Sequence, residues 1–538
     1  MKLTIFKVYF NQIVNNSNNL ISFLQSPLFW LKLVGSSVLG FSAFYIGKIW
    51  FSYRFFKKIG IKTPKYTFFY GNNLQLTKEN KYSEILMEWT KKFGKTYGYY
   101  QGHLPILVTS DLDIIQEVFV KQSKNFSARK RVPGSRDDKS IDHMLFTASG
   151  TRWKIIRNIV NPTFSSAKLR DLSHLLIDCT NRLNLILEKE QQHEIDISEF
   201  TMDSIWSCAF GIDANIQQDP QNEYNRRSEA IFSFLGRENL ISFVTNYLHE
   251  FENIFIRIML FSENYLYRLI DFTKYDPLYW FMNHLFKIVE IRKLDANKRK
   301  DYLQLLIDAE ADIDYTKLST NFNHNQILDK KLSTNGIKLN LISFMLAGYE
   351  TTSSALTYAC YILVKYQHEQ NKLYNLIKSN FNTDEDINSE DVLKIDYLDL
   401  FLKEVLRFYP IANPAVNRRC TQTTWVKGIK IPKDLVISID VMSLHFDSEL
   451  WGPVDPYLFY PERHQIKRNP LVFMSFGNGP RYCLGMKFAL LELKIALCKL
   501  LLNFEFLPAE GFPVELEVRE TIVRRPKNGL KILLKKRG

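Results

Sequence analysis

One cysteine in a glycine-rich loop constrains this chain more than any other feature. The stretch Phe476–Gly485 reads FGNGPRYCLG and runs straight into an apolar, helix-forming segment. A helix N-terminus carries partial positive charge and unpaired N–H groups, and Arg481 precedes Cys483 by two residues, so both favour a thiolate. The glycines allow backbone conformations closed to other residues and let a flat ligand approach the main chain. Cys483 is therefore a candidate axial ligand of haem iron.

The loop resembles the haem loop of the cytochrome P-450 family, F-G-x-G-x-R-x-C-x-G, at all six fixed positions. The alternative is that Cys483 is a buried small apolar residue, which is the commonest fate of a free cysteine. That alternative explains none of the glycine, arginine and aromatic partners at fixed offsets. The resemblance implies that Cys483 binds the iron, with Phe476 beside the haem and Arg481 on a propionate.

Composition limits the other classes of protein that this chain can belong to. Its 538 residues carry a formal net charge of +13 and are 46% hydrophobic, so a large core is possible. The six cysteines are scattered without a C-x-x-C pair, which argues against a disulfide framework and against a zinc finger. The lysines are dispersed and no nucleic-acid motif occurs, so we expect no nucleic-acid partner. A membrane and an acidic protein partner fit the charge better.

An apolar segment near the N-terminus predicts a membrane anchor at residues 28–51. Pro27 suits the first helical position, and only Lys32 and Lys48 interrupt the segment. Its 24 residues would form roughly 36 Å of helix, enough to cross a hydrocarbon core of about 30 Å with the lysines snorkelling. The alternatives are a buried core helix and a cleaved signal peptide.

The charges that flank this segment predict its orientation. Basic residues follow it at positions 54, 57, 58, 62 and 65, whereas only Lys2 and Lys7 lie well before it, so the C-terminal bulk should be cytoplasmic. We therefore predict a lumenal segment at 1–27, the anchor at 28–51, a basic linker at 52–65 and a catalytic domain at 66–538. In the resembled family such an anchor is typical of microsomal eukaryotic members, which implies the endoplasmic reticulum membrane. Asn15, in an Asn-Asn-Ser triplet, is a candidate glycosylation acceptor.

The remaining pattern predicts a mainly α-helical protein with small peripheral β-sheets. Residues 95–101 and 104–109 flank Gly102 as a hairpin, and a helix should follow from Ser110 or Asp111 to about Lys121. Helical periodicity dominates from Trp153 to about Gln370, interrupted by a loop at about 311–336. Near the C-terminus, residues 514–523 and 530–534 alternate around a turn at 526–529, which predicts a second hairpin. This arrangement matches the cytochrome P-450 fold that the resemblance implies.

A second motif, Ala347–Thr352 (AGYETT), lies inside a long apolar helix that should begin near Leu339. Glycine, an acid and two threonines are poor choices for a buried helix interior. A threonine hydroxyl can bond the carbonyl one turn back, and glycine opens room, so the helix should bend into a notch. The alternative is a kinked packing helix. The sequence resembles the family's A-G-x-[DE]-T-[TS] oxygen-activation motif, which implies that Glu350 and Thr351 are catalytic and deliver protons.

Two further patterns suggest how the loop is supported. Glu404 and Arg407 lie three residues apart and share a helix face, as in the family's E-x-x-R motif. The segment YPERH at 460–464 resembles the family's P-E-R-F, with His464 in place of phenylalanine. The resemblance implies a buried structural triad of Glu404, Arg407 and Arg463, whereas the alternative is an ordinary surface ion pair.

A group of cationic and aromatic residues is expected to hold the haem propionates. Trp153 and Arg157 lie one helical turn apart, and both can donate hydrogen bonds to a carboxylate, although an amphipathic helix with a half-buried tryptophan is the alternative. By resemblance the propionate ligands are Trp153, Arg157, Arg481, Arg129 and Arg418, and Arg419 is the alternative to Arg418.

Together these features predict a membrane-bound, haem-dependent monooxygenase that inserts one atom of O2 into a lipophilic substrate. The sequence most resembles the animal drug- and steroid-oxidising group of the family. The alternatives are a haem-thiolate hydroperoxide isomerase or dehydratase, and a non-catalytic haem-binding protein. The expected cofactor is haem b, with O2 as co-substrate.

The electrons are expected to come from another protein. No dinucleotide-binding motif follows a strand in this chain, so NADPH would act through a separate flavoprotein reductase, with cytochrome b5 as a second candidate donor. A basic face of Arg481, Lys487, Lys467 and Arg468 is the candidate docking surface for an acidic partner, and a generic solvated surface is the alternative. The substrate pocket is expected to involve residues 131–150 and 232–286.

Overall fold

The computed structural model describes residues 27–537 except 79–80, 132–143, 190–197, 220, 236–239, 267–276, 296–298, 300, 309–331 and 333. Most of the described chain is helical, and its strands form one four-stranded and three two-stranded sheets. The predicted class, mainly α with small peripheral sheets, is confirmed. Asn15 and the predicted loop at 311–336, except for its last residues, lie outside the described residues, as does most of the segment at 131–150.

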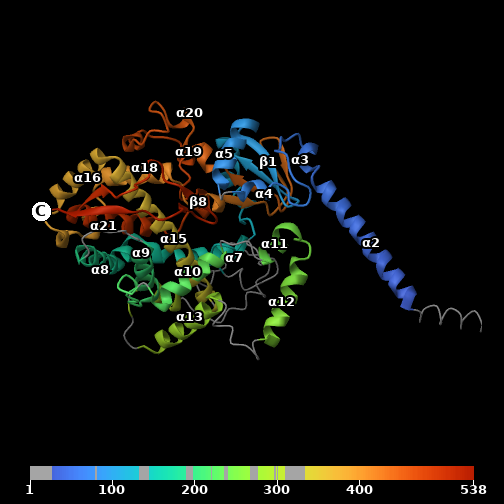
Figure 1. Cartoon of the computed structure of the whole chain (residues 1–538), viewed down its shortest axis with the longest axis horizontal. Coiled ribbons are helices and arrows are strands. Elements are labelled where there is room, and N and C mark those ends of the chain that lie inside the picture. Colours follow the sequence, from blue (N-terminus) through green and yellow to red (C-terminus); the bar gives the residue numbers. More distant parts are fainter. Residues whose placement is uncertain are drawn as a thin grey trace, which may run out of the picture.

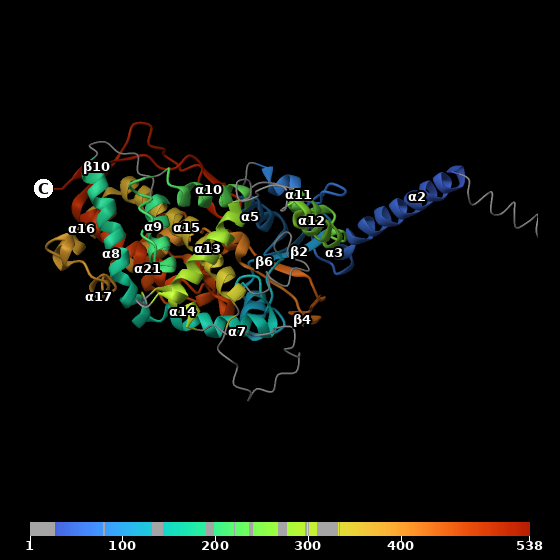
Figure 2. The same cartoon turned by 90° about the horizontal axis from the view of Figure 1, so that it is seen from below.

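Helix α2 (Pro27–Ser52) projects from the body of the molecule as a single long rod (Figures 1 and 2). Residues Leu31–Ser52 are long and apolar enough to cross a membrane, with a mean hydropathy of 1.3. Its C-terminal turns contact the body, because Phe41 and Tyr45 both pack against Phe251 at centroid distances of 5.9 and 5.4 Å. Ile49 is fully buried there. The helix is therefore exposed over most of its length and anchored at one end.

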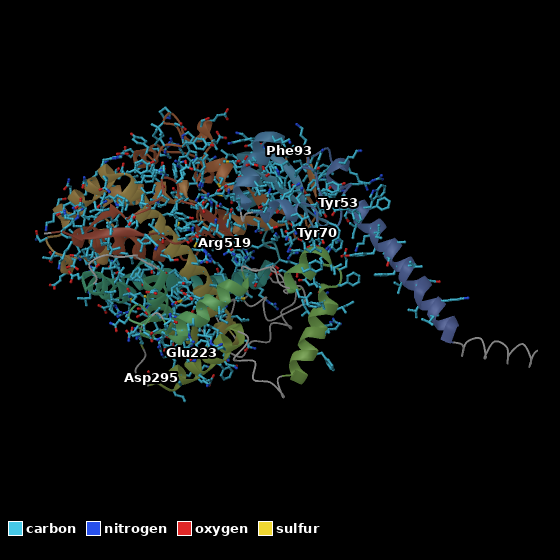
Figure 3. The ribbon with its side chains drawn as sticks, in the orientation of Figure 1. Tyr53, Tyr70, Phe93, Glu223, Asp295 and Arg519 are labelled. Carbon is cyan, nitrogen blue, oxygen red and sulfur yellow. The ribbon has the colours of Figure 1, made fainter. Side chains whose placement is uncertain are left out.

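An aromatic cluster holds the chain just after this helix. Tyr53 stacks on Tyr66 at 4.2 Å and meets Tyr100 edge-on at 5.0 Å. The Tyr100 hydroxyl donates a hydrogen bond to the Tyr53 carbonyl. Phe56, in the short helix α3 (Phe55–Lys58), is fully buried, and a Cβ at Gly98 would lie 2.5 Å from its ring. The segment at 52–65 thus packs on the body, and Tyr53 and Tyr70 are at the base of α2 (Figure 3).

The largest sheet has the order β1-β2-β6-β3 and lies near the base of α2 (Figure 1). β1 (Thr96–Gln101) and β2 (Leu104–Thr109) form the predicted hairpin, β2 pairs parallel with β6 (Val436–Ile439), and β6 pairs antiparallel with β3 (Asn417–Arg419). The helix predicted after the hairpin is α6 (Leu112–Gln116), continued by one π-helical turn to Lys121. Asp111 caps it by accepting from two backbone N–H groups.

The helical body surrounds α15 (Thr334–Lys365), whose residues are mostly buried (Figure 2). This helix begins five residues before the predicted start. The elements packed around it include α9 (Ser198–Ile205), α18 (Asp396–Phe408) and α21 (Met486–Asn503). The other long helices are α5 (Tyr82–Phe93), α7 (Gly150–Val160), α8 (Ser166–Lys189), α10 (Glu223–Leu235), α11 (Leu240–Tyr247), α12 (Glu252–Leu266), α13 (Pro277–Leu294), α14 (Tyr302–Ile307) and α16 (Gln367–Asn380).

The strand pairing near the C-terminus differs from the prediction. The alternating segment at 514–523 was expected to pair with 530–534. Instead, β10 (Ile532–Lys536) pairs with β7 (Phe504–Pro508), which follows α21 directly. β8 (Val518–Glu520) pairs with β9 (Arg524–Pro526) across a three-residue turn, and a smaller sheet joins β4 (Thr424–Val426) to β5 (Ile429–Ile431). Alternation identified the strands, but a nearby turn signal did not identify their partners.

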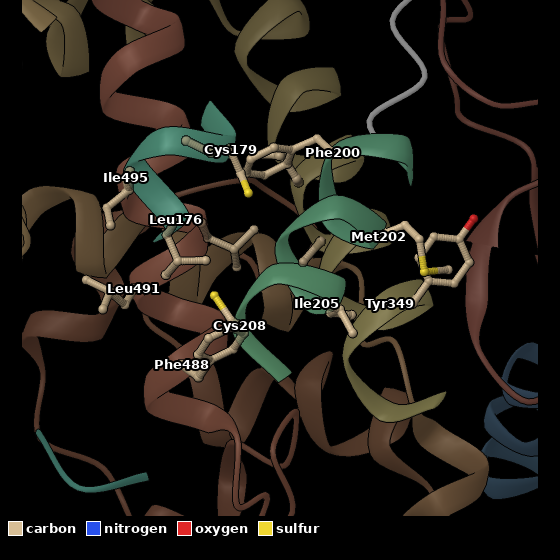
Figure 4. Close-up of a cluster of buried hydrophobic side chains, with 14 of the residues drawn as sticks. Leu176, Cys179, Phe200, Met202, Ile205, Cys208, Tyr349, Phe488, Leu491 and Ile495 are labelled. Atoms are coloured by element: carbon tan, nitrogen blue, oxygen red, sulfur yellow. The ribbon is translucent and has the colours of Figure 1, made fainter. Parts of the chain in front are cut away.

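The main core lies where α8, α9, α15 and α21 meet (Figure 4). Cys179, Cys208 and Phe488 are among its buried side chains. Glu492 of α21 is also buried there, and within the described residues neither of its carboxylate oxygens has a hydrogen-bond partner. Burial raises the pKa of Glu492 to about 8. Glu492 is therefore a protonated acid in the core at neutral pH.

This acid predicts a pH-dependent stability. Because the folded-state pKa of Glu492 is raised, the unfolded carboxyl ionises first, and stability should fall as pH rises from about 4.5 to about 8. Glu492→Gln removes this titration, so its melting temperature should depend less on pH over that interval than that of the unchanged protein. Glu510→Gln, at an exposed site, is the matched control. Parallel pH profiles for the unchanged protein and Glu492→Gln would contradict the protonated state.

Candidate active site

The cysteine loop is closed by its own backbone. The Cys483 N–H donates to the Phe476 carbonyl at 2.8 Å, and α21 begins three residues after the cysteine. Gly479 has φ of +68°, and a Cβ there would lie 2.0 Å from the Phe119 carbonyl oxygen. Glycine is therefore required at 479 both for its conformation and for the close approach of the π-helical turn that contains Phe119.

The Cys483 side chain is exposed, yet it is surrounded by enough protein that burial raises the pKa of its thiol. The backbone N–H groups of Gly485 and Met486, together with Arg157 and Arg129, oppose this effect. The sequence predicted that Arg481 would stabilise the thiolate, but the guanidiniums that act on the thiol are those of Arg157 and Arg129. A coordinated metal ion deprotonates a thiol outright, so a raised pKa is compatible with a ligand role.

Four arginines predicted to bind propionates are held by carbonyls and aromatic rings. Arg481 donates to the carbonyls of Leu145, Phe146 and Ala148, and Arg129 donates to those of Ala415 and Arg481. Each guanidinium also lies over a ring, at 4.0–4.7 Å from its centroid. These pairs are Arg129 with Phe146, Arg157 with Tyr482, Arg418 with Phe119, and Arg481 with Trp153.

No carboxylate of the described chain pairs with any of these four guanidiniums. Burial, and then repulsion from Arg129 and Arg157, lowers the pKa of Arg481 to about 8, and burial lowers that of Arg129 to about 10. Buried nitrogen atoms of Arg129, Arg157 and Arg481 also lack a hydrogen-bond partner within the described residues. Buried positive charge with spare donors is the arrangement expected around a polyanionic ligand.

The structure also separates Arg418 from Arg419. Arg418 is buried and donates to the Asn478 carbonyl, and burial together with Arg129 and Arg481 depresses its pKa. Arg419 instead forms an ion pair with Asp434. Arg418 is therefore the member of this pair that lies with the other cations.

The buried carboxylate of Glu404 collects the residues of the predicted triad. Arg407 binds it in a bidentate manner at 2.8 and 2.9 Å, and Arg463 donates through Nε at 2.9 Å. His464 Nε2 lies 2.9 Å from the second oxygen, and the Tyr460 N–H donates at 3.0 Å. Burial alone would raise the pKa of Glu404, but hydrogen bonds from Arg407 and His464 hold it at about 2.

This network reaches the cysteine loop through one buried histidine. Arg407 donates to the carbonyls of His445 and Pro456. His445 Nε2 in turn accepts from the backbone N–H of Met474, two residues before the loop begins, and the Ser475 hydroxyl donates to Leu406 of α18. Burial lowers the pKa of His445 to about 3, so it is a neutral acceptor. The entrance to the loop is therefore fixed to α18.

The Ala347–Thr352 motif lies in an unbroken part of α15. The Thr351 hydroxyl donates to the Ala347 carbonyl at 2.5 Å, as expected, and Ala347 is exposed although most neighbouring residues are buried. The helix is not interrupted at the motif, since α-helix continues from Thr334 to Lys365, and the bend stays a prediction. Gly348 instead makes room for α9, because a Cβ there would lie 3.0 Å from Ile205 Cδ1.

Glu350 faces a partner that the sequence did not suggest. It is buried and forms a 2.8 Å ion pair with Arg525 of β9. Burial raises its pKa, while Arg525 and Arg519 oppose that effect. Arg519 lies in β8, in the middle of the view in Figure 3. The C-terminal sheet therefore supplies the positive charge beside the acid of the motif.

Three features of the site escaped sequence reasoning. His464, which stands in place of the family's phenylalanine, is a donor to Glu404, and no sequence pattern indicated this contact. Arg525 lies 175 positions from Glu350, so no local pattern could pair them. In the predicted basic face, Arg481 is buried and Arg468 is bound to five backbone carbonyls, which leaves Lys467 and Lys487 as its exposed members.

Comparison with known proteins identifies the class. The family model described as Cytochrome P-450 matches residues 61–533. Cytochrome P-450 3A9 of Rattus norvegicus is 30% identical, with 93% of this chain and 95% of the relative covered. Putative cytochrome P-450 CYP13A7 of Caenorhabditis elegans is 32% identical (90% and 95% covered), and cytochrome P-450 3A28 of Bos taurus is 29% identical (91% and 93% covered).

The chain therefore belongs to the cytochrome P-450 family, as the sequence predicted, and the relatives just named are animal members. It is a haem-dependent monooxygenase, an oxidoreductase of the class that uses O2, a redox partner and lipophilic substrates. The described residues fit a haem, since an exposed thiol lies in a glycine loop beside uncompensated guanidiniums with spare N–H groups. The two propionates of a haem would supply the missing negative charge.

The Glu404 network predicts different losses of stability when His464 or Arg463 is replaced. His464→Phe restores the residue usual in the family and removes one of five contacts, so it should lower the free energy of unfolding by about 1–2 kcal/mol. Arg463→Leu leaves a buried carboxylate short of a charge partner and should cost about 3–5 kcal/mol. Urea unfolding followed by tryptophan fluorescence measures both, and equal losses would contradict the ranking.

Proposed function

We propose that this chain is a membrane-anchored haem-thiolate monooxygenase that receives electrons from a separate NADPH-dependent reductase and oxidises a lipophilic substrate. One observation supports it above the others. The exposed thiol of Cys483 lies in a backbone-closed loop, beside buried arginines that have no carboxylate partner in the described chain. A non-catalytic haem-binding protein would have no need of the Glu350 and Thr351 side chains on α15.

The residues that would hold the cofactor, haem b, fall into two groups. Cys483 is the proposed axial ligand of the iron, with Phe476 at the start of the same loop. Bound haem supplies the activation of O2, and its thiolate ligand favours O–O cleavage. The proposed propionate ligands are the indole and guanidinium groups already described, namely Arg129, Trp153, Arg157, Arg418 and Arg481.

Glu350 and Thr351 are the proposed catalytic residues, and they have different tasks. The Thr351 hydroxyl donates to the Ala347 carbonyl, so it must release that bond to donate a proton elsewhere. The raised pKa of Glu350 brings this buried carboxyl closer to a range in which it can exchange protons. Arg525 pairs with the ionised form of Glu350, and the Arg525 side chain is partly exposed to solvent. In this proposal protons reach Glu350 from solvent beside Arg525.

The electron donor we propose is an NADPH-dependent flavoprotein, with cytochrome b5 as a second donor. The exposed Lys467 and Lys487 precede and follow the cysteine loop, respectively, in a region of positive charge, which suits an acidic partner. Because charge pairs between these exposed lysines and an acidic partner are screened by salt, turnover should weaken as the salt concentration rises.

Glu404, Arg407 and Arg463 have a structural role that keeps the cysteine loop in place.

We place the protein in the endoplasmic reticulum membrane with its catalytic domain in the cytoplasm. Helix α2 has 26 residues, about 39 Å, which exceeds a hydrocarbon core of about 30 Å. The basic residues at 54–65 support cytoplasmic orientation. In this proposal residues 1–27 are lumenal, 28–51 are the anchor, 52–65 are the basic linker and 66–538 are the catalytic domain.

The function predicts that Thr351→Ala uncouples oxygen consumption from product formation. Without the hydroxyl, the fraction of NADPH recovered as peroxide should rise several-fold, while the haem content stays unchanged. The measurement is NADPH, O2, peroxide and product in one reaction with purified reductase and a panel of lipophilic substrates. Thr357→Ala is the matched control. The Thr357 hydroxyl makes the same kind of bond, to the Ser353 carbonyl one helical turn back, but it lies outside the motif.

Equal coupling in Thr351→Ala and Thr357→Ala would contradict the catalytic role of Thr351. Turnover of a hydroperoxide without reductase, and none with reductase and O2, would replace the proposal by the isomerase alternative.

A further inference from the structure

Two histidines and a glutamate converge at the base of the membrane helix. His103 lies in the β1–β2 turn, and His249 and Glu250 lie between α11 and α12. Each offers one ligand atom, and the three atoms lie within 4.8 Å of one another. The residues are buried or half-buried, and none belongs to the site around Cys483.

The contacts of Glu250 exceed the capacity of one oxygen atom. Oε1 faces Lys48 Nζ at 2.8 Å, His103 Nε2 at 3.0 Å and His249 Nε2 at 3.3 Å, whereas Oε2 accepts from the Tyr45 hydroxyl at 3.0 Å. A carboxylate oxygen has two lone-pair sites, so three nitrogen donors cannot all be satisfied there. An imidazole that presents a lone pair in place of its N–H would remove the conflict, provided that a cation lies between the groups.

The spacing suits a small divalent cation. Bonds of about 2.0–2.1 Å in tetrahedral geometry set ligand atoms about 3.3–3.4 Å apart. The two nitrogen-to-oxygen separations here are 3.0 and 3.3 Å, and the two nitrogens lie within 4.8 Å of each other, so only the nitrogen-to-nitrogen separation would have to shorten appreciably. The two rings are already close, with centroids 4.2 Å apart.

The tautomer of His103 is also free to change. This residue is almost fully buried, and its Nδ1 has no hydrogen-bond partner among the described residues. Glu250 Oε1 is therefore the only described neighbour that favours hydrogen on Nε2, and a cation that replaces this contact would leave the Nε2 lone pair available as a ligand.

We propose that His103, His249 and Glu250 form a zinc site that joins the β1–β2 turn to the α11–α12 connection. Two imidazole nitrogens and one carboxylate oxygen are a donor set that Zn²⁺ prefers, and a water molecule completes the tetrahedron. The site is independent of the haem. Its place beside Tyr45 and Lys48 would fix the surface on which α2 rests.

Lys48 is the competitor for this cation. Its ammonium group contacts the same Glu250 oxygen, but its side chain is 46% exposed and can swing into solvent. Zinc and the ammonium cannot both lie against Oε1, because two positive centres would repel. Removing the charge at position 48 should therefore strengthen zinc binding. If the cluster were only a set of ionic contacts to Glu250, the same substitution would weaken it.

The test is a ZnCl2 titration of the full-length, haem-loaded protein in detergent, read with a competing chromophoric chelator. The unchanged protein should take up one equivalent. His103→Gln and His249→Gln should each weaken binding at least tenfold, and Lys48→Gln should strengthen it several-fold. His368→Gln is the matched control, because His368 contacts Glu369 at 3.3 Å without a second histidine recorded beside it. It should leave the affinity unchanged.

Absence of one-equivalent uptake by the unchanged protein would overturn the proposal, as would uptake that neither histidine variant alters. If His103→Gln fails to fold, the zinc affinities of His249→Gln and Lys48→Gln provide the test. Weaker or unchanged zinc binding in Lys48→Gln would contradict a cation that takes the place of the Lys48 ammonium group on Glu250.

Discussion

The buried carboxylate of Glu404 is the interaction on which the rest of the active site depends. It binds two guanidiniums, an imidazole and a backbone N–H, and it lies at the meeting point of α18 and the turn at 460–464. The same arginines satisfy carbonyls of neighbouring loops, and His445 extends the network to the backbone just before the cysteine loop. Removing one partner would leave an unpaired charge in the core, so these residues stabilise the site only as a complete set.

The site contains two sets of buried arginines that differ in one respect. Arg407 and Arg463 are neutralised by Glu404, and they shape the fold. The guanidiniums of the second set, Arg129, Arg157, Arg418 and Arg481, are buried or half-buried and rest on rings and carbonyls, with no carboxylate of the described chain as a partner. The first set is structural because its charge is already balanced. The charge of the second set is not balanced in this way, which supports the proposal that these residues bind the propionates of a haem.

Sequence reasoning succeeded where the chemistry is local. The glycine loop, the Thr351 bond to the preceding turn and the Glu404–Arg407 spacing are all set by a few adjacent residues. It failed where the partner is distant. The β10 strand pairs with β7 rather than with the nearest alternating segment, and Glu350 meets Arg525 from the far end of the chain. Arg481 likewise donates to carbonyls of the segment before α7, which no local pattern reveals.

The central claim is that Cys483 ligates haem iron as a thiolate. Its most direct test is the carbon monoxide difference spectrum of the reduced, purified protein, beside Cys483→Ala and the control Cys420→Ala, which alters a buried cysteine elsewhere. The account predicts the strongly red-shifted Soret band of a thiolate-ligated haem in the unchanged protein and in Cys420→Ala, and its loss in Cys483→Ala. Absence of that band from folded, haem-loaded protein, or its survival in Cys483→Ala, would contradict it.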